Sequence, residues 1–329
     1  MNVVYVSDDN YSMLLGISLT SLYINNKSEK KLDVYIVDDG IGESNRRKIL
    51  STAHRFGREI FFVKPNQDKI AITRMGKWPS NVFYRLLLDI LMEEFVQLDR
   101  AIYIDCDTII LESLVDLWNT NIEDKICAAV LECMDDNHKK RCGLKADDSY
   151  YNSGMILIDL VKWRSRKISF QMLNVIERNM QKKLEYPDEE IFNNVLRNQI
   201  FTLKPSYNIT SIKSEFLYDE LKMYRKSSVM YPKKIYEEVL EKAHVIHYTG
   251  NFAVRRPWFS GKSKAHKREA DFLKYKMQSE WKKELLIEER LNIEHKIMRE
   301  IMDKHRRIGI CLASFLYRNI KPYCYSKLV

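Results

Sequence analysis

The amino-acid sequence predicts an α/β fold, in which helices cover both faces of a mostly parallel sheet. Before residue 105, short apolar runs and amphipathic stretches follow one another in the order β-α-β-α-β. That order is typical of parallel strands joined by crossover helices. Three of the apolar runs end in acidic residues. The 329 residues and the 45% hydrophobic content are sufficient for a packed core.

The first half of the chain contains the alternating elements. Residues 2–10 predict a strand that ends in polar residues, and residues 12–25 then show helical spacing. The next elements are a strand at 31–40, a helix at 42–56, a strand at 59–64 stopped by Pro65, and a helix at 82–95 with Phe83, Leu87, Leu91 and Phe95 in register.

The second half continues with strands predicted at 155–160, 200–205 and 243–250. Residues 186–198 predict a helix, because Pro187 suits a first turn and three acids follow it. A charged helix is expected over 280–307, with Leu286, Ile293, Ile297 and Ile301 on one side.

Asp105 and Asp107 follow the pattern of a buried strand. Burying a carboxylate costs free energy unless it pairs with a positive charge or binds a metal ion. Two carboxylates on a short turn suit a hard divalent cation. The plainer interpretations of such a pair are helix capping and a solvated turn. Ligands of parallel sheets bind beyond the carboxyl ends of the strands. Acids stand at this edge after three strands, at Asp8-Asp9, Asp38-Asp39 and Asp105/Asp107.

The formal charge of +9 is unevenly placed. Residues 255–329 hold 19 Lys and Arg against 9 Asp and Glu, whereas the rest holds 35 against 36. This localises an anionic partner to the last quarter of the chain. The six cysteines form no C-x-x-C pair and have no zinc spacing. With no signal-peptide pattern and no apolar run near the ~20 residues of a membrane span, a cytoplasmic protein with reduced thiols is expected.

Several separated motifs, taken in order, resemble the retaining glycosyltransferases of family 8, which include bacterial lipooligosaccharide galactosyltransferases and glycogenin. They are "VVYVSDDNY", "YRLLL", "YIDCDTII", "YYNSGMILIDLVKWR" and "HYTG…RPW". The resemblance covers about residues 1–260 and implies a catalytic domain of the GT-A type there. Residues 261–329 are then expected to form a basic helical extension.

The resemblance also implies roles for single residues. It implies a Mn²⁺ site, with Mg²⁺ as the alternative, formed by Asp105, Asp107 and His247. It places Arg85, Asn152, Asp188 and Glu189 at the reacting sugar. The UDP-hexose is expected to contact Val6, Asp8, Asn10, Tyr11, Asp105, Cys106, Asp107, Gly250 and Arg256. Tyr11 would stack on uracil.

Two positions depart from the family's pattern. The usual Asp-Gln-Asp is Asp188-Glu189-Glu190 here. Glu189 is then a support for the transition state, which we favour, a nucleophile, or a partner of a cation. The plainer interpretation is that the three acids only favour the helix N-terminus. The late motif is about two residues longer than usual, which leaves Arg255 and Arg256 as alternatives for the residue that binds the diphosphate.

The expected function is therefore transfer of galactose or glucose from a UDP-sugar to a glycan acceptor in the synthesis of bacterial cell-surface glycans or glycoproteins. A sugar-1-phosphate nucleotidyltransferase is the alternative enzyme, but "SDDNYSMLLG" lacks its glycine-rich, lysine-bearing signature. The non-enzymatic alternative binds an anionic partner through the basic region, which has no signature for specific nucleic-acid binding.

Basic residues alternate with aromatic ones near the C-terminus, including Phe315, Tyr317, Tyr323 and Tyr325. This pattern suits an anionic membrane surface, and related enzymes that act on lipid-linked acceptors carry such tails. A peripheral location on the inner face of the cytoplasmic membrane is therefore expected. The alternative is a helical segment that packs on the catalytic domain.

Overall fold

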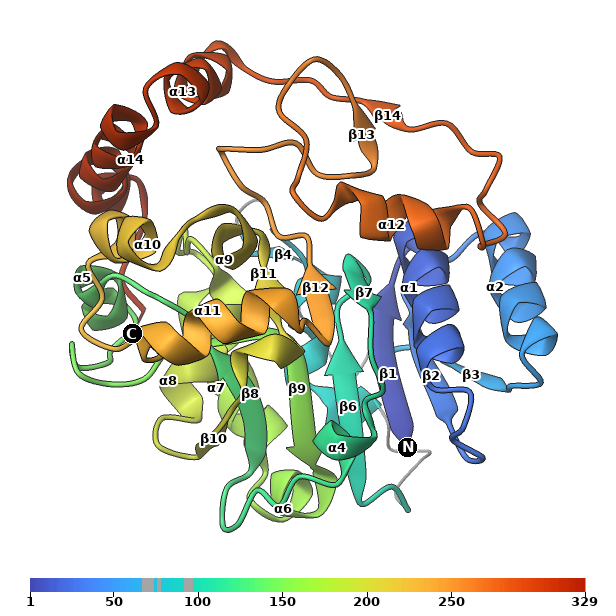
Figure 1. Cartoon of the computed structure of the whole chain (residues 1–329). Helices are drawn as coiled ribbons and strands as arrows, with labels where there is room; N and C mark the ends of the chain where they lie inside the picture. The colour runs from blue at the N-terminus through green and yellow to red at the C-terminus, as the bar shows by residue number, and fades with distance from the viewer. Residues whose placement is uncertain (67–73, 76–77, 92–96, 329) are drawn as a thin grey trace.

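The computed structural model describes residues 1–66, 74–75, 78–91 and 97–328, and a seven-stranded sheet forms its centre (Figure 1). The strand order is β10-β8-β9-β6-β1-β2-β3. Only β9 runs antiparallel to its neighbours among these strands, so the predicted mostly parallel sheet is confirmed. In chain order the strands are β1 (Asn2–Ser7), β2 (Asp33–Asp38), β3 (Ile60–Val63), β6 (Arg100–Ile104), β8 (Cys127–Leu131), β9 (Tyr151–Asp159) and β10 (Ile200–Leu203).

Helices cover both faces of this sheet because successive strand residues point in opposite directions. Val3 and Tyr5 of β1 belong to a core that includes apolar residues of α1 (Ser12–Asn25). Val4, between them, belongs to the core on the other face, with side chains of α7 (Ile168–Asn179) and α8 (Pro187–Val195). Helix α2 (Glu43–Arg55) packs beside α1 (Figure 1).

A second, three-stranded sheet lies at the carboxyl end of β6. Its order is β11 (Ile209–Thr210), β12 (Val245–His247) and β7 (Thr108–Ile110). Strands β12 and β7 are antiparallel, and His247 pairs with Thr108. This register brings His247 beside Asp107, although 139 positions separate His247 from Thr108 in the chain.

The helix predicted over 82–95 is wrong as a single α-helix. Residues Ser80–Leu86 form the 3₁₀ helix η1, and α3 (Leu88–Leu91) follows after Leu87. Phe83, Leu87 and Leu91 are nevertheless buried as expected. Phe95 lies outside the described residues.

The continuous helix predicted over 280–307 is also wrong. Residues Ile287–Glu288 form β14, which pairs with β13 (Phe259–Ser260), so this part of the chain is extended. The helix α13 begins only at Ile293 and ends at Lys304. The side chain of Asn292 caps its first turn by accepting a hydrogen bond from the amide of His295. Helix α14 (Arg306–Phe315) follows directly.

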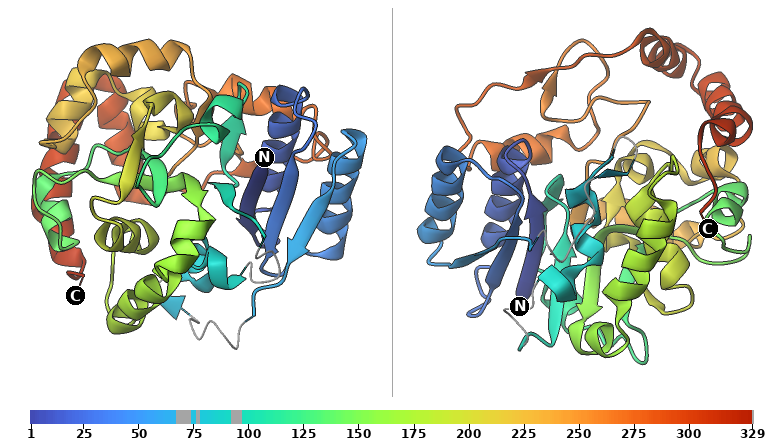
Figure 2. Two further views of the ribbon diagram at one scale, coloured as in Figure 1. Left: turned by 90° about the horizontal axis from the view of Figure 1, so that it is seen from below. Right: turned by 180° about the vertical axis from the view of Figure 1, so that it is seen from behind.

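The chain beyond β12 arches over the edge of the sheet at which the parallel strands end, as the orange and red segments show in Figure 1 and in the right-hand view of Figure 2. Its helix α12 (Glu269–Lys276) contacts α1, and α14 contacts α10 (Tyr218–Arg225). Trp281 is buried against Gly16 of α1 so closely that a Cβ at Gly16 would lie 1.9 Å from the indole ring.

None of the helices described is long and apolar enough to cross a membrane. The remaining described elements connect the layers. They are β4 (Arg74–Met75), β5 (Trp78–Pro79), α4 (Val115–Trp118), α5 (Asp136–Arg141), α6 (Leu160–Ser165), η3 (Pro205–Tyr207), α9 (Ser211–Glu215), α11 (Lys233–Glu241), η4 (Leu316–Ile320) and η5 (Lys321–Cys324).

Candidate active site

A cavity of about 1340 Å³ opens at the carboxyl edge of the large sheet. It exceeds the roughly 300–1,000 Å³ of a typical small-molecule site, so it has room for two substrates. With one exception, the residues predicted for the site line it: Val6, Asp8, Tyr11, Arg85, Asp105, Cys106, Asp107, Asn152, Asp188, Glu189, His247, Gly250 and Arg256.

Asn10 is the exception. Its side chain is exposed and donates a 3.5 Å hydrogen bond to Asp8, which does line the cavity. The acids after β2 have structural partners instead. Asp38 accepts hydrogen bonds from the amide of Ile41 and from Arg46, and Asp39 accepts one from the Tyr84 hydroxyl. Two of the three predicted acidic pairs therefore contribute to the cavity.

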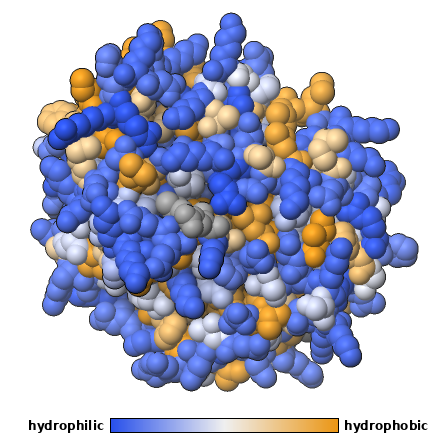
Figure 3. Space-filling model, viewed as in Figure 1, coloured by the Kyte–Doolittle hydropathy of each residue, from blue (hydrophilic) through white to orange (hydrophobic). Residues whose placement is uncertain are grey.

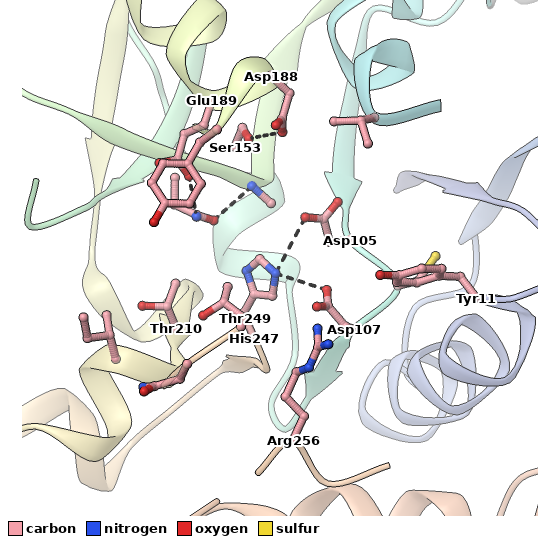
Figure 4. Close-up of a pocket in the computed structure, with 18 of the residues that line it drawn as sticks. Tyr11, Asp105, Asp107, Ser153, Asp188, Glu189, Thr210, His247, Thr249 and Arg256 are labelled. Carbon is pink, nitrogen blue, oxygen red and sulfur yellow. Dashed lines mark hydrogen bonds and ion pairs between the residues drawn. The ribbon is translucent and has the colours of Figure 1, made fainter. Parts of the chain in front are cut away.

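Asp105, Asp107 and His247 form a cluster whose potential ligand atoms lie within 4.8 Å of one another. The His247 Nε2 atom is 3.1 Å from Asp107 Oδ1 and 3.6 Å from Asp105 Oδ2, as the dashed lines in Figure 4 show. Gly154 packs directly against the cluster, where a Cβ would lie 2.2 Å from the imidazole and 2.7 Å from Asp105. Only glycine allows strand β9 to approach so closely.

Asn208 holds the imidazole in one orientation. It accepts a 3.1 Å hydrogen bond from His247 Nδ1 through its Oδ1, since its Nδ2 donates a 2.7 Å bond to Asn152. The Nε2 lone pair of His247 is then directed at the two carboxylates. Asn152 in turn donates a 2.8 Å hydrogen bond to Glu189, so a row of buried amides joins the cluster to Glu189.

The charges around the cluster differ between the two aspartates. Burial raises the pKa of Asp105, although Arg85 at 2.9 Å and His247 oppose this. Burial acts in the same direction on Asp107, but His247 and Arg256 outweigh it and lower the pKa of that carboxyl. Two carboxylates and one imidazole with a fixed Nε2 are a donor set that fits a divalent cation.

Arg85 links the cluster to the start of α8. Its guanidinium lies 2.9 Å from Asp105 and 3.3 Å from Asp188, and its side chain is only 14% exposed. The Ser153 hydroxyl also donates a 3.0 Å hydrogen bond to Asp188. The acidic first turn of α8 is thereby held against β9 and faces the cavity.

Glu189 lies on the opposite side of His247 from Arg256 (Figure 4). Burial, Glu132 and Asp188 raise its pKa well above the usual range, and the positive charges of Lys213 and Arg225 offset only part of this. The carboxyl group therefore favours its protonated form, whose oxygen still accepts the bond from Asn152.

The two arginines of the late motif have different surroundings. Arg256 lines the cavity and points toward Asp107 in Figure 4, with its guanidinium 4.9 Å from the Trp258 ring. Arg255 is 9% exposed and forms a 2.9 Å ion pair with Glu269. Arg256 is therefore the member of the pair available to a ligand.

Several residues that line the cavity or, like Asn208, support its side chains from behind were not predicted from the sequence. Ser153 and Gly154 fall inside a recognised motif and could have been singled out from it. Asn208 stands in "PSYNIT", which carries no distinguishing pattern. Further cavity residues come from segments for which the sequence predicts no contact with the site, among them Glu132, Arg225, Glu288, Glu289, Arg290, Leu291, Asn292, His295, Arg299 and Lys321.

The chain is similar to known proteins both in sequence and in fold. The sequence profile described as Glycosyl transferase family 8 matches residues 2–261. The chain is 28% identical to general stress protein A of Bacillus subtilis over 285 residues, 85% of this chain and 94% of that protein. It is 29% identical to a lipopolysaccharide 1,2-glucosyltransferase of Escherichia coli over 264 residues, 78% of this chain and 72% of that protein.

The fold is also similar to the solved structure of galactosyltransferase LgtC in complex with donor and acceptor sugar analogues. The TM-score is 0.67, and the match covers 90% of this chain and 99% of that one at 21% identity. At this level of identity, the likeness establishes the fold, which is of the GT-A type.

Proposed function

The chain belongs to glycosyl transferase family 8, and from this premise we propose that it is a metal-dependent, retaining hexosyltransferase. It transfers glucose or galactose from a UDP-sugar to a hydroxyl group of a bacterial cell-surface glycan or glycoprotein. Family membership favours this reaction over nucleotidyl transfer and over a purely binding role for the basic region.

The observation that carries the proposal is the cluster of Asp105, Asp107 and His247 beside Arg256 at the edge of the large cavity. A mixed nitrogen and oxygen donor set suits Mn²⁺, with Mg²⁺ as the alternative. When bound, the cation acts as a Lewis acid on the diphosphate that leaves the sugar.

The protein's own groups complete the donor site. The Arg256 guanidinium neutralises part of the charge that develops on the leaving diphosphate, and its planar fork can donate two hydrogen bonds to it. Tyr11, which is 44% exposed at the cavity rim, offers its ring to uracil. The Asp8 carboxylate accepts hydrogen bonds from the uridine. Gly250 leaves open space for a phosphate, since a Cβ there meets no described atom within 4 Å.

Retention of configuration follows from attack on the same face of the sugar that the diphosphate leaves. Glu189 has a raised pKa and is held by Asn152, so it supports the transition state as a neutral hydrogen-bonding group. Arg85 and Asp188 orient the hexose hydroxyls. A covalent route would instead need an ionised Glu189.

The donor sugar and the acceptor are the least constrained parts of the proposal. Relatives named as a lipopolysaccharide glucosyltransferase and a galactosyltransferase support glucose and galactose as candidates. We assign catalysis to residues 1–260 and place the enzyme in the cytoplasm. The extension, residues 261–329, adds affinity for the anionic inner face of the membrane.

The test is a panel of nucleotide sugars with Mn²⁺, Mg²⁺ or chelator, read as release of UDP. UDP-glucose or UDP-galactose should be hydrolysed slowly with Mn²⁺, and chelator should abolish the reaction. Asp107→Asn should remove the metal-dependent rate, whereas Asp124→Asn, at an exposed aspartate, should leave it unchanged. Equal rates of wild type and Asp107→Asn, in Mn²⁺ and in chelator, would refute the proposed metal-dependent reaction.

A further inference from the structure

Arg225 is a buried cation that lines the cavity and has no acidic partner among the residues that the structure describes. It is the last residue of α10 and is 8% exposed. Its Nε and Nη1 atoms have no hydrogen-bond partner, and no ion pair of this side chain is found within the described part of the chain. A buried charge without partners is costly, so the position is not explained by stability.

Aromatic rings hold the Arg225 guanidinium in place. Its central carbon lies 4.3 Å from the centre of the Tyr317 ring and 4.8 Å from that of Tyr224. Such contacts stabilise a cation without using its N–H donors. Arg225 is therefore oriented, and its donors stay available for a ligand.

Three other cations of this cavity are already neutralised. Arg85 pairs with Asp105 at 2.9 Å, Arg299 pairs with Glu289 at 2.6 Å, and Lys321 pairs with Glu185 at 2.6 Å. Glu132, which also lines the cavity, forms its ion pair with Lys213, at 3.0 Å. Arg225 differs from all of these in lacking a carboxylate.

Arg225 lies near the start of α8, to whose first turn Glu189 belongs. The Tyr317 ring, 4.3 Å from the Arg225 guanidinium carbon, is 5.2 Å from Lys321 Nζ, and this atom is 5.4 Å from the ring of Tyr186, the residue before α8. The proposed donor diphosphate lies on the other side of His247, near Asp107 and Arg256. An anion at Arg225 therefore belongs to the second substrate, for which the cavity of about 1340 Å³ has room.

We propose that Arg225 forms an acceptor subsite for a carboxylate or phosphate group, so that the preferred acceptor is an acidic sugar or a phosphorylated one. The inference rests on the proposed transferase function and specifies its acceptor. A guanidinium binds both anions through paired N–H donors, so the two sources share one recognition chemistry.

Direct binding tests the subsite without relying on turnover. Galactose, galacturonic acid and galactose 6-phosphate serve as neutral, carboxylate and phosphate probes, titrated calorimetrically into the full-length protein with Mn²⁺ and UDP. Wild type should bind at least one acidic probe about ten- to a hundredfold more tightly than galactose, the range of a charged hydrogen-bonded pair. The stronger of the two acidic probes identifies the source of the anion.

The variants separate binding from folding. Arg225→Gln should lose the preference for the acidic probe, and Arg225→Lys should keep part of it. Lys222→Gln, at an exposed position of the same helix, should behave as wild type. The acidic probe should raise the thermal midpoint of wild type but not that of Arg225→Gln, because only a bound ligand stabilises the native state.

Equal affinity of wild type for all three sugars would overturn the subsite. An unchanged acidic preference in Arg225→Gln would do so as well. If the nucleotide-sugar panel shows no turnover, the transferase proposal fails, whereas the probe affinities still decide whether Arg225 binds anions.

Discussion

Asn208 connects the two ends of the cavity, because it bonds both to His247 and to Asn152. It is fully buried, so its amide has no water to replace these partners. Its bond to His247 involves Nδ1, so that Nε2 stays directed at the two carboxylates. Asn208 thus acts as a positioning residue for the imidazole on one side and for the Glu189 environment on the other.

Asn208→Leu should weaken Mn²⁺ binding about ten- to a hundredfold, the usual effect of removing a group that orients a metal ligand. The reason is that the His247 ring loses the acceptor for its Nδ1–H. Calorimetric titration with Mn²⁺ measures the effect. Asn208→Asp keeps an acceptor and should bind Mn²⁺ more tightly than the Leu variant, whereas equal weakening in both variants would indicate a general packing defect.

Glu189→Gln should keep activity within about tenfold of wild type, since the neutral carboxyl and an amide offer the same acceptor to Asn152. UDP release at saturating donor measures this, with donor affinity determined separately. A thousandfold loss at unchanged donor affinity contradicts front-face attack. Mass spectrometry of a glycosylated peptide containing Glu189 would then establish the covalent route.

The short pairing of β7 with β12 brings His247 to the candidate metal cluster, and the segment after β13 packs against the neighbouring helix α9. His266 is 2% exposed and contacts the hydroxyls of Ser211 and Ser214 in α9 at 3.2 Å. Its Nδ1 accepts a 3.0 Å hydrogen bond from the amide of Arg268, so the folded protein holds the neutral ring.

This environment predicts a loss of stability in acid. Burial, with Arg268 and Lys267 adding to it, lowers the pKa of His266 from 6.5 to about 3. At pH values between these two pKa values, His266 binds a proton only in the unfolded chain. The free energy of unfolding therefore falls as pH decreases from 6.5, by up to about 1.4 kcal/mol per pH unit. The loss is complete below a pH of about 3.

Urea unfolding at pH 7.5 and pH 5 measures the effect. His266→Gln should reduce the difference between the two pH values by about 1–2 kcal/mol, because the amide does not titrate in this range. Glu215, 3.9 Å from His266, also titrates but is present in both proteins. His54→Gln, at an exposed histidine, is the control, and an equal pH dependence of all three proteins would contradict the assignment.

Residues of the extension line one side of the cavity and form part of the hydrophobic core. Trp281 illustrates this, since its ring lies in the same core as β1 and α1 and its indole N–H is 3.3 Å from Asn45. The extension is therefore integrated with the catalytic body as well as carrying its basic charge.

Trp281→Ala should cost about 3–5 kcal/mol of stability, because it leaves a cavity next to Gly16 of α1. Chemical denaturation measures the change. Leu285→Ala, in the same extension but 88% exposed, should stay within about 0.5 kcal/mol of wild type. A loss below about 1 kcal/mol for Trp281→Ala would mean that the extension is separable from the body.

The extension also leaves apolar side chains exposed on its outer helices, among them Ile308 at 62% and Phe315 at 56%. Orange side chains gather in that region of Figure 3, whereas most of the visible surface is hydrophilic. Phe315→Glu should reduce sedimentation with anionic vesicles severalfold, because it removes apolar contact and adds repulsion. Phe170→Glu, 54% exposed on α7, should not, and wild type that fails to sediment would refute membrane association.

Local patterns of the sequence were enough to predict the alternation of strands and helices, the acids after β1 and β6, and the helix that begins at Pro187. Each depends on residues a few positions apart, through side-chain periodicity, turn chemistry or helix capping. Where a local pattern competed with tertiary pairing it failed, as at Ile287, which joins β14 instead of a helix.

Contacts between distant residues were decided only by the tertiary structure. The register of β7 and β12 brings His247 to Asp107, a meeting that the family resemblance implied but that no local pattern predicts. Asn208 joins two segments that no motif connects, and the Nε and Nη1 atoms of Arg225 have no hydrogen-bond partner among the described residues. These arrangements depend on how both cores and the extension pack together, and packing is set by the burial of side chains from the whole chain. For that reason the sequence determined the chemistry available at the sheet edge, and the tertiary structure decided which groups meet there.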